Sequence, residues 1–454
     1  MKTRHLSLPA RSARVSPLTL ALACAALAPG VNAWAQTQVV KPPIAQYWMD
    51  VATMSMAGMD EMPDMPAMPA MGALGGVMGG MVGMPGMGGV SFGATRGMMP
   101  GRWLDLAVVT QRKPAGTEAT QTIPAGQNMG PSLVLLPVEA QPSARPPGRE
   151  GVDEMPERPK GRILFYWGCS ETVRSGQPRV LDFAKTGMED YGKFMMGRAV
   201  RDTGAKATPG HAIWPNEKQR QKVPANASLM GQHALSGEGL PASLKFAIGQ
   251  AQDFMPRLAL ASLGGGASAT NVSWPGLPTA RAYFLNAMSG SDNAGEAEMV
   301  IWSSSEVPEP GWGLMDYASN ANVDKWLTEK VLLPASQTQC AIPAGIFAKA
   351  QGAMLRGIAY GQELNLAHPP RPTDKRIAWE PEWAAKIRVK SMTMATLGED
   401  GARGQPRASR SGSANQPQDN PGADQPGVEP EKPKTPAIPG LPDVGRALKG
   451  LFGG

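Results

Sequence analysis

The chain has 454 residues, of which 42% are hydrophobic and 18% are charged, and its formal net charge is +6. The charged fraction lies below the globular average of roughly 25%, which argues against a charge-driven nucleic-acid-binding protein. With only 3 cysteines and 4 histidines, the sequence excludes a disulfide-rich scaffold or a cysteine-based cluster, and it leaves little for a histidine-based metal centre.

The first 35 residues have the pattern of a secretory signal peptide. Four basic side chains precede an apolar run at 18–28, and Ala33 and Ala35 form an Ala-x-Ala cleavage pattern. We expect cleavage after Ala35 and a mature protein in the periplasm or associated with the cell envelope. Residues 1–35 contain four positive charges and no acids, so their removal lowers the formal charge from +6 to +2. Nucleic acid is therefore not an expected partner.

Cleavage removes Cys24 and leaves Cys169 and Cys340 in an oxidising compartment. Both cysteines lie in strand-like surroundings, and the pair predicts one structural disulfide; two buried free thiols are the alternative. A lipoprotein acylated at Cys24 is disfavoured, because Ala21 stands three residues earlier where leucine is usual.

Methionine recurs every third residue in two runs between Met54 and Met99. This period matches polyproline II, which has three residues per turn, and does not match the 3.6-residue α-helix. Thioethers are soft ligands that select Cu(I) and Ag(I) over harder metal ions. The candidate ligands are the ten methionines of the two runs: Met56, Met59, Met62, Met65, Met68, Met71, Met78, Met81, Met84 and Met87.

A low-complexity linker is the favoured interpretation of this segment, because strongly biased composition usually prevents a packed core. Three alternatives stay open. They are a soft-metal site, an oxidant sink in which methionine forms its sulfoxide, and membrane association through the uncharged residues 65–95. The abundance of glycine and the small number of large apolar side chains weaken the membrane interpretation.

The middle of the chain predicts a mainly β fold. An aromatic stretch at 47–50 can add a strand, and the glycines at 264–266 are interpreted as a joint between two β-rich domains, 102–263 and 267–397. Apolar or alternating runs predict strands at 103–110, 132–138, 162–169, 179–183, 243–250, 257–263, 272–274, 280–288, 298–304, 338–342, 353–366 and 386–395. Helices are predicted within 184–202 and at 323–332, the second capped by Asn320 or Asn322.

The start of the second domain resembles fibronectin type III and related immunoglobulin-like sandwiches. A strand ending in Trp274 is followed by Ala280–Met288, which contains Tyr283, then by a loop and Glu298–Ser304. In those folds a Trp and a Tyr fill the space between two sheets. The resemblance implies architecture and no activity. We therefore expect two sandwich-like, immunoglobulin-like domains with short helical insertions.

Low-complexity extensions are expected on both sides of this body. The N-terminal extension is placed at 36–101 and the C-terminal one at 398–454, where the composition cannot repay the entropy of ordering. Apolar residues at 444–452 are spaced for a short terminal helix that can dock or associate with a membrane.

Familiar catalytic motifs are absent from the sequence. There is no G-x-S-x-G elbow, no phosphate-binding loop, no dinucleotide-binding glycine pattern after a strand and no H-E-x-x-H. His211, His233 and His368 are scattered without the spacing of a ligand set. We expect no enzymatic activity and no cofactor other than Cu(I) on the methionine segment.

Several stretches are similar to a group of uncharacterised exported proteins of Gram-negative bacteria. They are YWMD at 47–50, the Met/Gly run, KGRILFYWGC at 160–169 and QDFMP at 252–256. The resemblance implies export and domain order only. The expected function is a non-enzymatic binding or structural role in the envelope, with a protein or a saccharide as partner. Soft-metal handling or oxidant buffering is the alternative, followed by an enzyme of unrecognised type.

Overall fold

The computed structural model describes residues 38–57, 90–139, 161–185, 187–265, 267–293, 296–349 and 352–397. The prediction of a mainly β fold is confirmed, and the strands build layered sheets of the sandwich type. The immunoglobulin-like detail stays a prediction.

One sheet of 15 strands contains strands from both halves of the chain. Its members are β1 (Ala45–Met56), β2 (Gly101–Thr110), β3 (Ala119–Thr122), β4 (Ser132–Pro137), β5 (Gly161–Trp167), β6 (Arg179–Asp182), β7 (Ala212–Trp214), β8 (Gly231–Gly237), β9 (Lys245–Ile248), β12 (Ala282–Asn293), β13 (Glu296–Ser303), β14 (Leu333–Pro334), β16 (Ala353–Tyr360), β17 (Leu364–His368) and β18 (Trp383–Leu397). Their order is β6-β5-β13-β12-β16-β18-β1-β2-β7-β4-β3-β8-β9, with β14 beside β12 and β17 beside β18. A separate three-stranded sheet has the order β10-β11-β15, made by β10 (Ala261–Gly264), β11 (Thr270–Ser273) and β15 (Gln339–Ile342).

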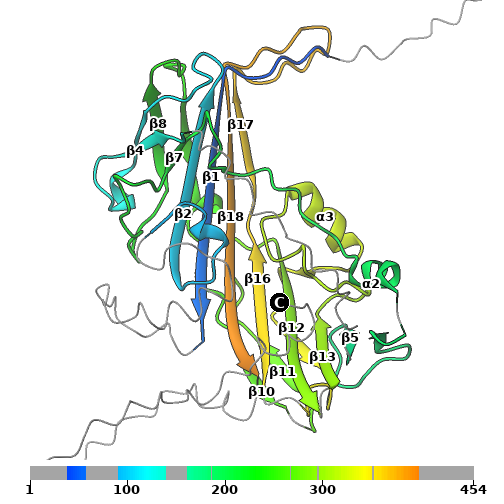
Figure 1. The fold of residues 1–454 in the computed structure, drawn as a ribbon. Helices are drawn as coiled ribbons and strands as arrows, with labels where there is room; N and C mark the ends of the chain where they lie inside the picture. The colour runs from blue at the N-terminus through cyan, green and yellow to red at the C-terminus, as the bar shows by residue number, and fades with distance from the viewer. Residues whose placement is uncertain are drawn as a thin grey trace, which may run out of the picture.

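The strands β1 and β18 lie side by side in the middle of the large sheet (Figure 1). They are parallel, with Ala45 opposite Trp383 and Met56 opposite Met394, and β2 pairs antiparallel with the other side of β1. The predicted strand at 47–50 is thus confirmed as part of β1. Its run of apolar residues fits a central strand that is covered on both faces.

One face of the large sheet holds the main core. At one end the sheet curls over itself, so that Tyr47 donates a 2.8 Å hydrogen bond to Gln121 of β3 and its ring lies 5.4 Å from that of Phe246 on β9. The three-stranded sheet covers the other half of this face. Between the two layers, Trp274 and Tyr283 pack edge to face at 5.4 Å.

Two helices cover parts of the opposite face. The helix α3 (Asn320–Thr328) places Val323 and Trp326 in a cluster with side chains of β12 and β16. The helix α2 (Met188–Met195) places Phe194 against Phe165 of β5. Three short 3-10 turns are η2 (Ala94–Arg96), η3 (Ala125–Gln127) and η4 (Gln250–Gln252).

A disulfide joins Cys169, just after β5, to Cys340 on β15. It ties the large sheet to the three-stranded layer. Backbone hydrogen bonds on both sides of it, from Ser170 to Ala341 and from Ala344 to Glu171, reinforce the same connection.

Three local predictions were wrong. The strand before Trp274 was expected to pair with the two strands that follow it, but β11 lies in the three-stranded sheet, while β12 pairs with β13. The cap of α3 is Ser319, whose side chain accepts from the backbone of Asn322, because Ser319 is the residue with extended backbone before the first turn. The stretch at 353–366 is broken into β16 and β17 rather than forming one strand.

The glycines at the predicted joint lie in a tight turn. Gly264 and Gly265 have φ values of +92° and +126° and connect β10 to β11 as a hairpin. At Gly264 a Cβ would collide with the carbonyl of Ala269. Both positions therefore favour glycine.

Candidate functional site

Most of the predicted metal ligands, Met59 to Met87, lie outside the described residues. Met56 is described and ends β1 opposite Met394 of β18. Within the described part of the chain, no group of three or more His, Cys, Asp or Glu side chains is placed to hold a metal ion.

The histidines are held by ordinary contacts. Buried His233 contacts Gln121 at 3.0 Å and the Leu229 carbonyl at 2.7 Å, and burial lowers its pKa. His211 contacts Thr208, and burial lowers its pKa as well. His368 stacks on Trp383. The interpretation of these residues as hydrogen-bonded or packed side chains is supported.

The strand register brings together residues that are distant in sequence on one face of the large sheet. Side chains of successive even-numbered residues in β1 and β18 point to this face, because side chains alternate along a strand. The rows across the strands are Ala367–Ala384–Gln46, Asn365–Lys386–Trp48, Arg388–Asp50–Asp105, Lys390–Ala52–Trp103 and Met392–Met54–Gly101. The first two rows line a groove, and the third begins a cluster of charges.

The groove lies at the end of the sheet where two extended segments leave the body together (Figure 1). These segments are joined by backbone hydrogen bonds from Trp379 to Val39 and from Lys41 to Trp379. The groove has a volume of about 600 Å³. Its lining combines the small side chains of Ala367 and Ala384, which are register partners, with the large rings of Trp48 and Trp379.

The polar lining of the groove includes two cationic side chains, those of Arg371 and Lys386. It also includes two amide side chains, those of Gln46 and Asn365. The guanidinium of Arg371 lies 5.4 Å over the Trp379 ring. Its Nε donates 2.7 Å to the neutral side chain of Gln38.

Lys386 and Asn365 are fixed by one carboxylate. Lys386 Nζ lies 3.3 Å from Glu363 Oε2, and Asn365 donates 2.7 Å to Glu363 Oε1. Glu363 is 7% exposed. A buried anchor of this kind limits the rotamers of both side chains, so the groove is arranged before any ligand arrives.

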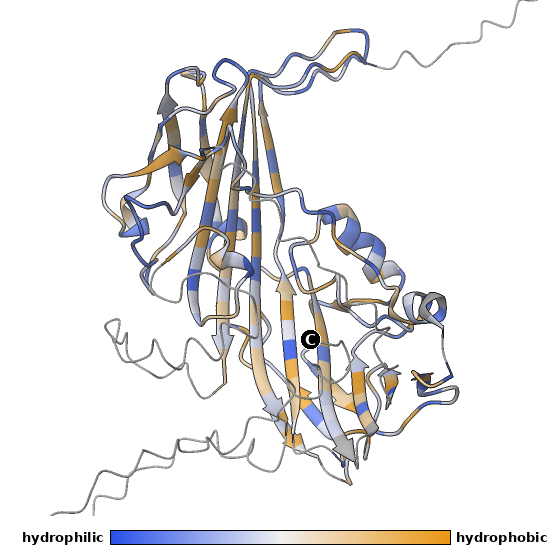
Figure 2. Cartoon of the chain, in the orientation of Figure 1, coloured by the Kyte–Doolittle hydropathy of each residue, from blue (hydrophilic) through white to orange (hydrophobic). Residues whose placement is uncertain are grey.

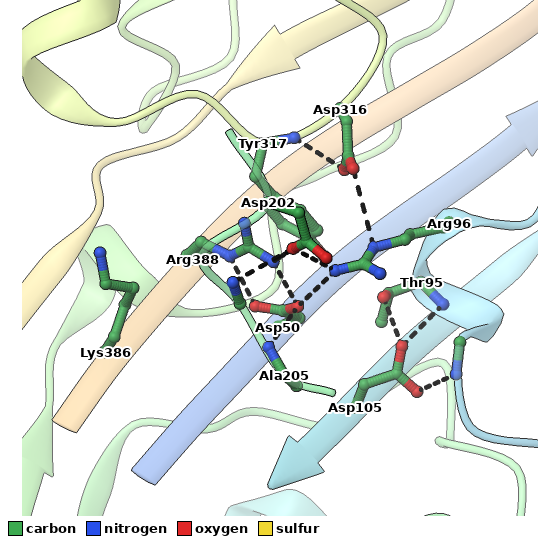
Figure 3. Close-up of polar contacts among 12 residues, drawn as sticks. Asp50, Thr95, Arg96, Asp105, Asp202, Ala205, Asp316, Tyr317, Lys386 and Arg388 are labelled. Atoms are coloured by element: carbon green, nitrogen blue, oxygen red, sulfur yellow. Dashed lines mark hydrogen bonds and ion pairs between the residues drawn. The ribbon is translucent and has the colours of Figure 1, made fainter. Parts of the chain in front are cut away.

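Beside the groove the sheet carries a buried cluster of charges (Figure 3). Arg388 donates to both carboxylate oxygens of Asp50, at 2.7 and 2.5 Å, and the two side chains are only 3% and 1% exposed. The backbone of Ala205 donates a third hydrogen bond to Asp50. Burial disfavours the charged form of Arg388 and alone would lower its pKa. The hydrogen bonds to Asp50 and the negative charge of Asp50 outweigh this effect, so the pKa of Arg388 is raised.

Asp105 faces Asp50 across the antiparallel pair of β1 and β2. It accepts hydrogen bonds from the backbone of Gly93 and from the backbone and hydroxyl of Thr95. Burial, with a further contribution from the charge of Asp50, raises the pKa of Asp105 to about 6, although these hydrogen bonds oppose the shift.

A second ion pair completes the cluster. Lys390 Nζ lies 2.8 Å from Asp316, and the ring of buried Tyr317 has Arg388 and Lys390 each 4.4 Å from its centroid. Arg96 links the cluster to the surface through Asp202 at 2.7 Å. Hydrophilic residues alternate with hydrophobic ones along this part of β18 (Figure 2). Because the buried charges of this cluster, Asp50, Arg388 and Lys390, are each paired, they hold the strands together rather than present a reactive group.

Sequence reasoning noted Trp48 and Asp50 only as part of an aromatic stretch, and it missed Arg388, Trp379 and Lys386 as site residues. One feature of the sequence does point to the charge cluster: Asp50 is the single acidic residue inside the apolar run of β1, and a buried carboxylate needs a partner. The identity of that partner depends on the pairing of β1 with β18.

None of the described helices has the length and apolar character needed to cross a membrane. The predicted membrane-associating segments lie largely (65–95) or wholly (444–452) outside the described residues. No protein-family model matches the chain, and no curated protein or solved structure matches it.

Proposed function

We propose that the chain is an exported, non-enzymatic binding protein that takes a saccharide in the groove between Trp48 and Trp379. The observation that carries the proposal is the row of Asn365, Lys386 and Trp48, which presents an amide, a cation and an aromatic ring side by side on adjacent strands. The signal peptide, cleavage after Ala35 and location in the periplasm or envelope belong to the same proposal.

The chemistry of the groove supports a saccharide. Tryptophan offers a flat apolar face with a polar edge, which suits the apolar face of a sugar ring. The amides of Gln46 and Asn365 can exchange hydrogen bonds with hydroxyl groups. The volume of about 600 Å³ lies within the range of small-ligand sites.

The charge of the groove favours a saccharide that carries carboxylates. Lys386 shares Glu363, whereas Arg371 donates through Nε to a neutral amide, so the groove has a net positive charge. Arginine binds carboxylates in a planar, bidentate geometry. Uronate-containing chains should therefore bind more tightly than neutral ones, and less so at high salt.

The test is a titration of the mature protein with uronate-containing and neutral oligosaccharides, followed by tryptophan fluorescence and calorimetry. We expect saturable binding that Trp379→Ala abolishes and Arg371→Gln weakens for the uronates only. Trp312→Ala is the matched control, because Trp312 is 38% exposed and does not line the groove. Equal behaviour of Trp379→Ala and Trp312→Ala, or no binding across the panel, would refute the proposal.

A further inference from the structure

The same face of the sheet carries four methionines on two neighbouring strands, next to the charge cluster. Met54 lies opposite Met392, and Met56 lies opposite Met394, in the parallel pair of β1 and β18. The two positions on each strand are separated by one residue, so all four side chains project to one face. This rectangle of methionines, which we call the thioether patch, is independent of the groove and of the saccharide proposal.

The spacing allows four sulfurs to meet. Neighbouring strands lie about 4.8 Å apart, and alternate residues of one strand about 6.7 Å apart. Methionine is unbranched and has three rotatable bonds, so its sulfur can move by several ångströms. In contrast, methionines one polyproline turn apart have backbones separated by roughly 9 Å. The sheet therefore supplies a closer set of thioethers than the repeated segment does in an extended conformation.

Three of the four methionines of the patch are partly exposed. Met54 is 3% exposed, whereas Met56, Met392 and Met394 are half-buried. Arg356 is the register partner of Met394 on β16, and its charge would oppose a cation. However, its guanidinium donates 2.8 Å to Asn286 of β12, on the side away from β18.

We propose that Met54, Met56, Met392 and Met394 form a binding site for one soft monovalent cation, Cu(I) or Ag(I). Thioether sulfurs prefer such ions to Zn(II), Mg(II) or Ca(II). The site uses the first methionine of the repeated segment, Met56, together with residues from the far end of the chain.

The experiment is a titration of the mature, full-length protein with Ag(I), which needs no reductant, and then with Cu(I) held by a competing chelator. Methionine methyl groups labelled with ¹³C report on each thioether. We expect the methyl signals of the four patch residues to shift together and to saturate at the first equivalent. Met196, which is 71% exposed and lies elsewhere, should not shift at that point.

Leucine substitutions separate the patch from the repeated segment. Met→Leu nearly conserves volume and costs less than about 1.5 kcal/mol, so Met392→Leu should stay folded. We expect Met392→Leu to weaken the first Ag(I) equivalent by about tenfold or more, since even indirect partners of a metal contribute about that much. The matched control replaces the methionines at 59, 62, 65 and 68 by leucine. This variant should bind the first equivalent of Ag(I) with unchanged affinity.

Two results with the variants would overturn the proposal, and a third comes from the unaltered protein. One is that Met392→Leu binds the first equivalent of Ag(I) with unchanged affinity. The other is its loss in the variant of the repeated segment, which would place the tight site there. The methyl shifts of the unaltered protein decide the matter even if a variant misfolds, because absence of joint shifts in the four patch residues also contradicts the site.

Discussion

Asp50 and Arg388 are separated by 338 residues in the sequence and form a bidentate ion pair on adjacent parallel strands. Each side chain is at least 97% buried. The pair fixes the register of β1 against β18, because a shift of either strand by one residue would turn its charge to the opposite face. The same register aligns the groove residues and the thioether patch.

Removing one partner of this pair should be costly. Asp50→Asn leaves Arg388 charged and buried, so we expect a loss of about 3–5 kcal/mol in the free energy of unfolding, measured with urea. The double variant Asp50→Leu with Arg388→Met should lose less than the sum of the losses of Asp50→Leu and Arg388→Met measured singly, since no unpaired charge remains. Asp374→Asn alters an exposed pair with Arg376 and should leave the urea midpoint unchanged. Additive effects of the two single changes would contradict the coupling.

The backbone over the ion pair leaves no room for a side chain at Gly204. A Cβ there would overlap Arg388 Nη2 and lie 2.5 Å from Asp50 Oδ2. We expect Gly204→Ala to destabilise the protein by about 1–3 kcal/mol through displacement of the pair. At Gly249 a Cβ meets nothing within 4 Å. Gly249→Ala is therefore the control, and thermal unfolding of the two variants compares them; equal melting temperatures would show that the overlap is relieved without cost.

The disulfide closes a long loop, since Cys169 and Cys340 are 171 residues apart. The chain-entropy model gives an upper limit of about 5 kcal/mol for a loop of this size. We expect Cys169→Ser with Cys340→Ser to lower the urea midpoint and to cost about 2–5 kcal/mol. Reductant should also lower the urea midpoint of the unaltered protein. It should leave the urea midpoint of the variant unchanged. A variant as stable as the unaltered protein would mean that the bond contributes nothing to folding.

The sequence predicted the strands with strong apolar or alternating patterns, such as those at 103–110 and 386–395. It also predicted the disulfide, since the expected signal-peptide cleavage leaves only Cys169 and Cys340. It missed β3 (Ala119–Thr122), which is a short and mostly polar run, and β8 (Gly231–Gly237), which begins and ends with glycine, because neither has the apolar or alternating pattern of a strand. The pairing of β1 with β18 could not be predicted, because the local pattern carries no information about partners hundreds of residues away. The groove and the charge cluster both depend on that pairing.

The buried carboxyl of Asp105 should make stability depend on pH. Its pKa is about 6 in the folded protein and near 3.8 when exposed, so the folded state holds the proton more tightly. Stability from this group is present at low pH and is lost as the pH rises from about 4 through 6. We expect Asp105→Asn to remove a decline of about 2 kcal/mol between pH 4 and 7. Urea unfolding across this range measures the difference between the two proteins.

Asp182→Asn is the control, because the pKa of Asp182 is lowered and that residue titrates below this range. Parallel curves for Asp105→Asn and the unaltered protein would show that Asp105 is already ionised at pH 4.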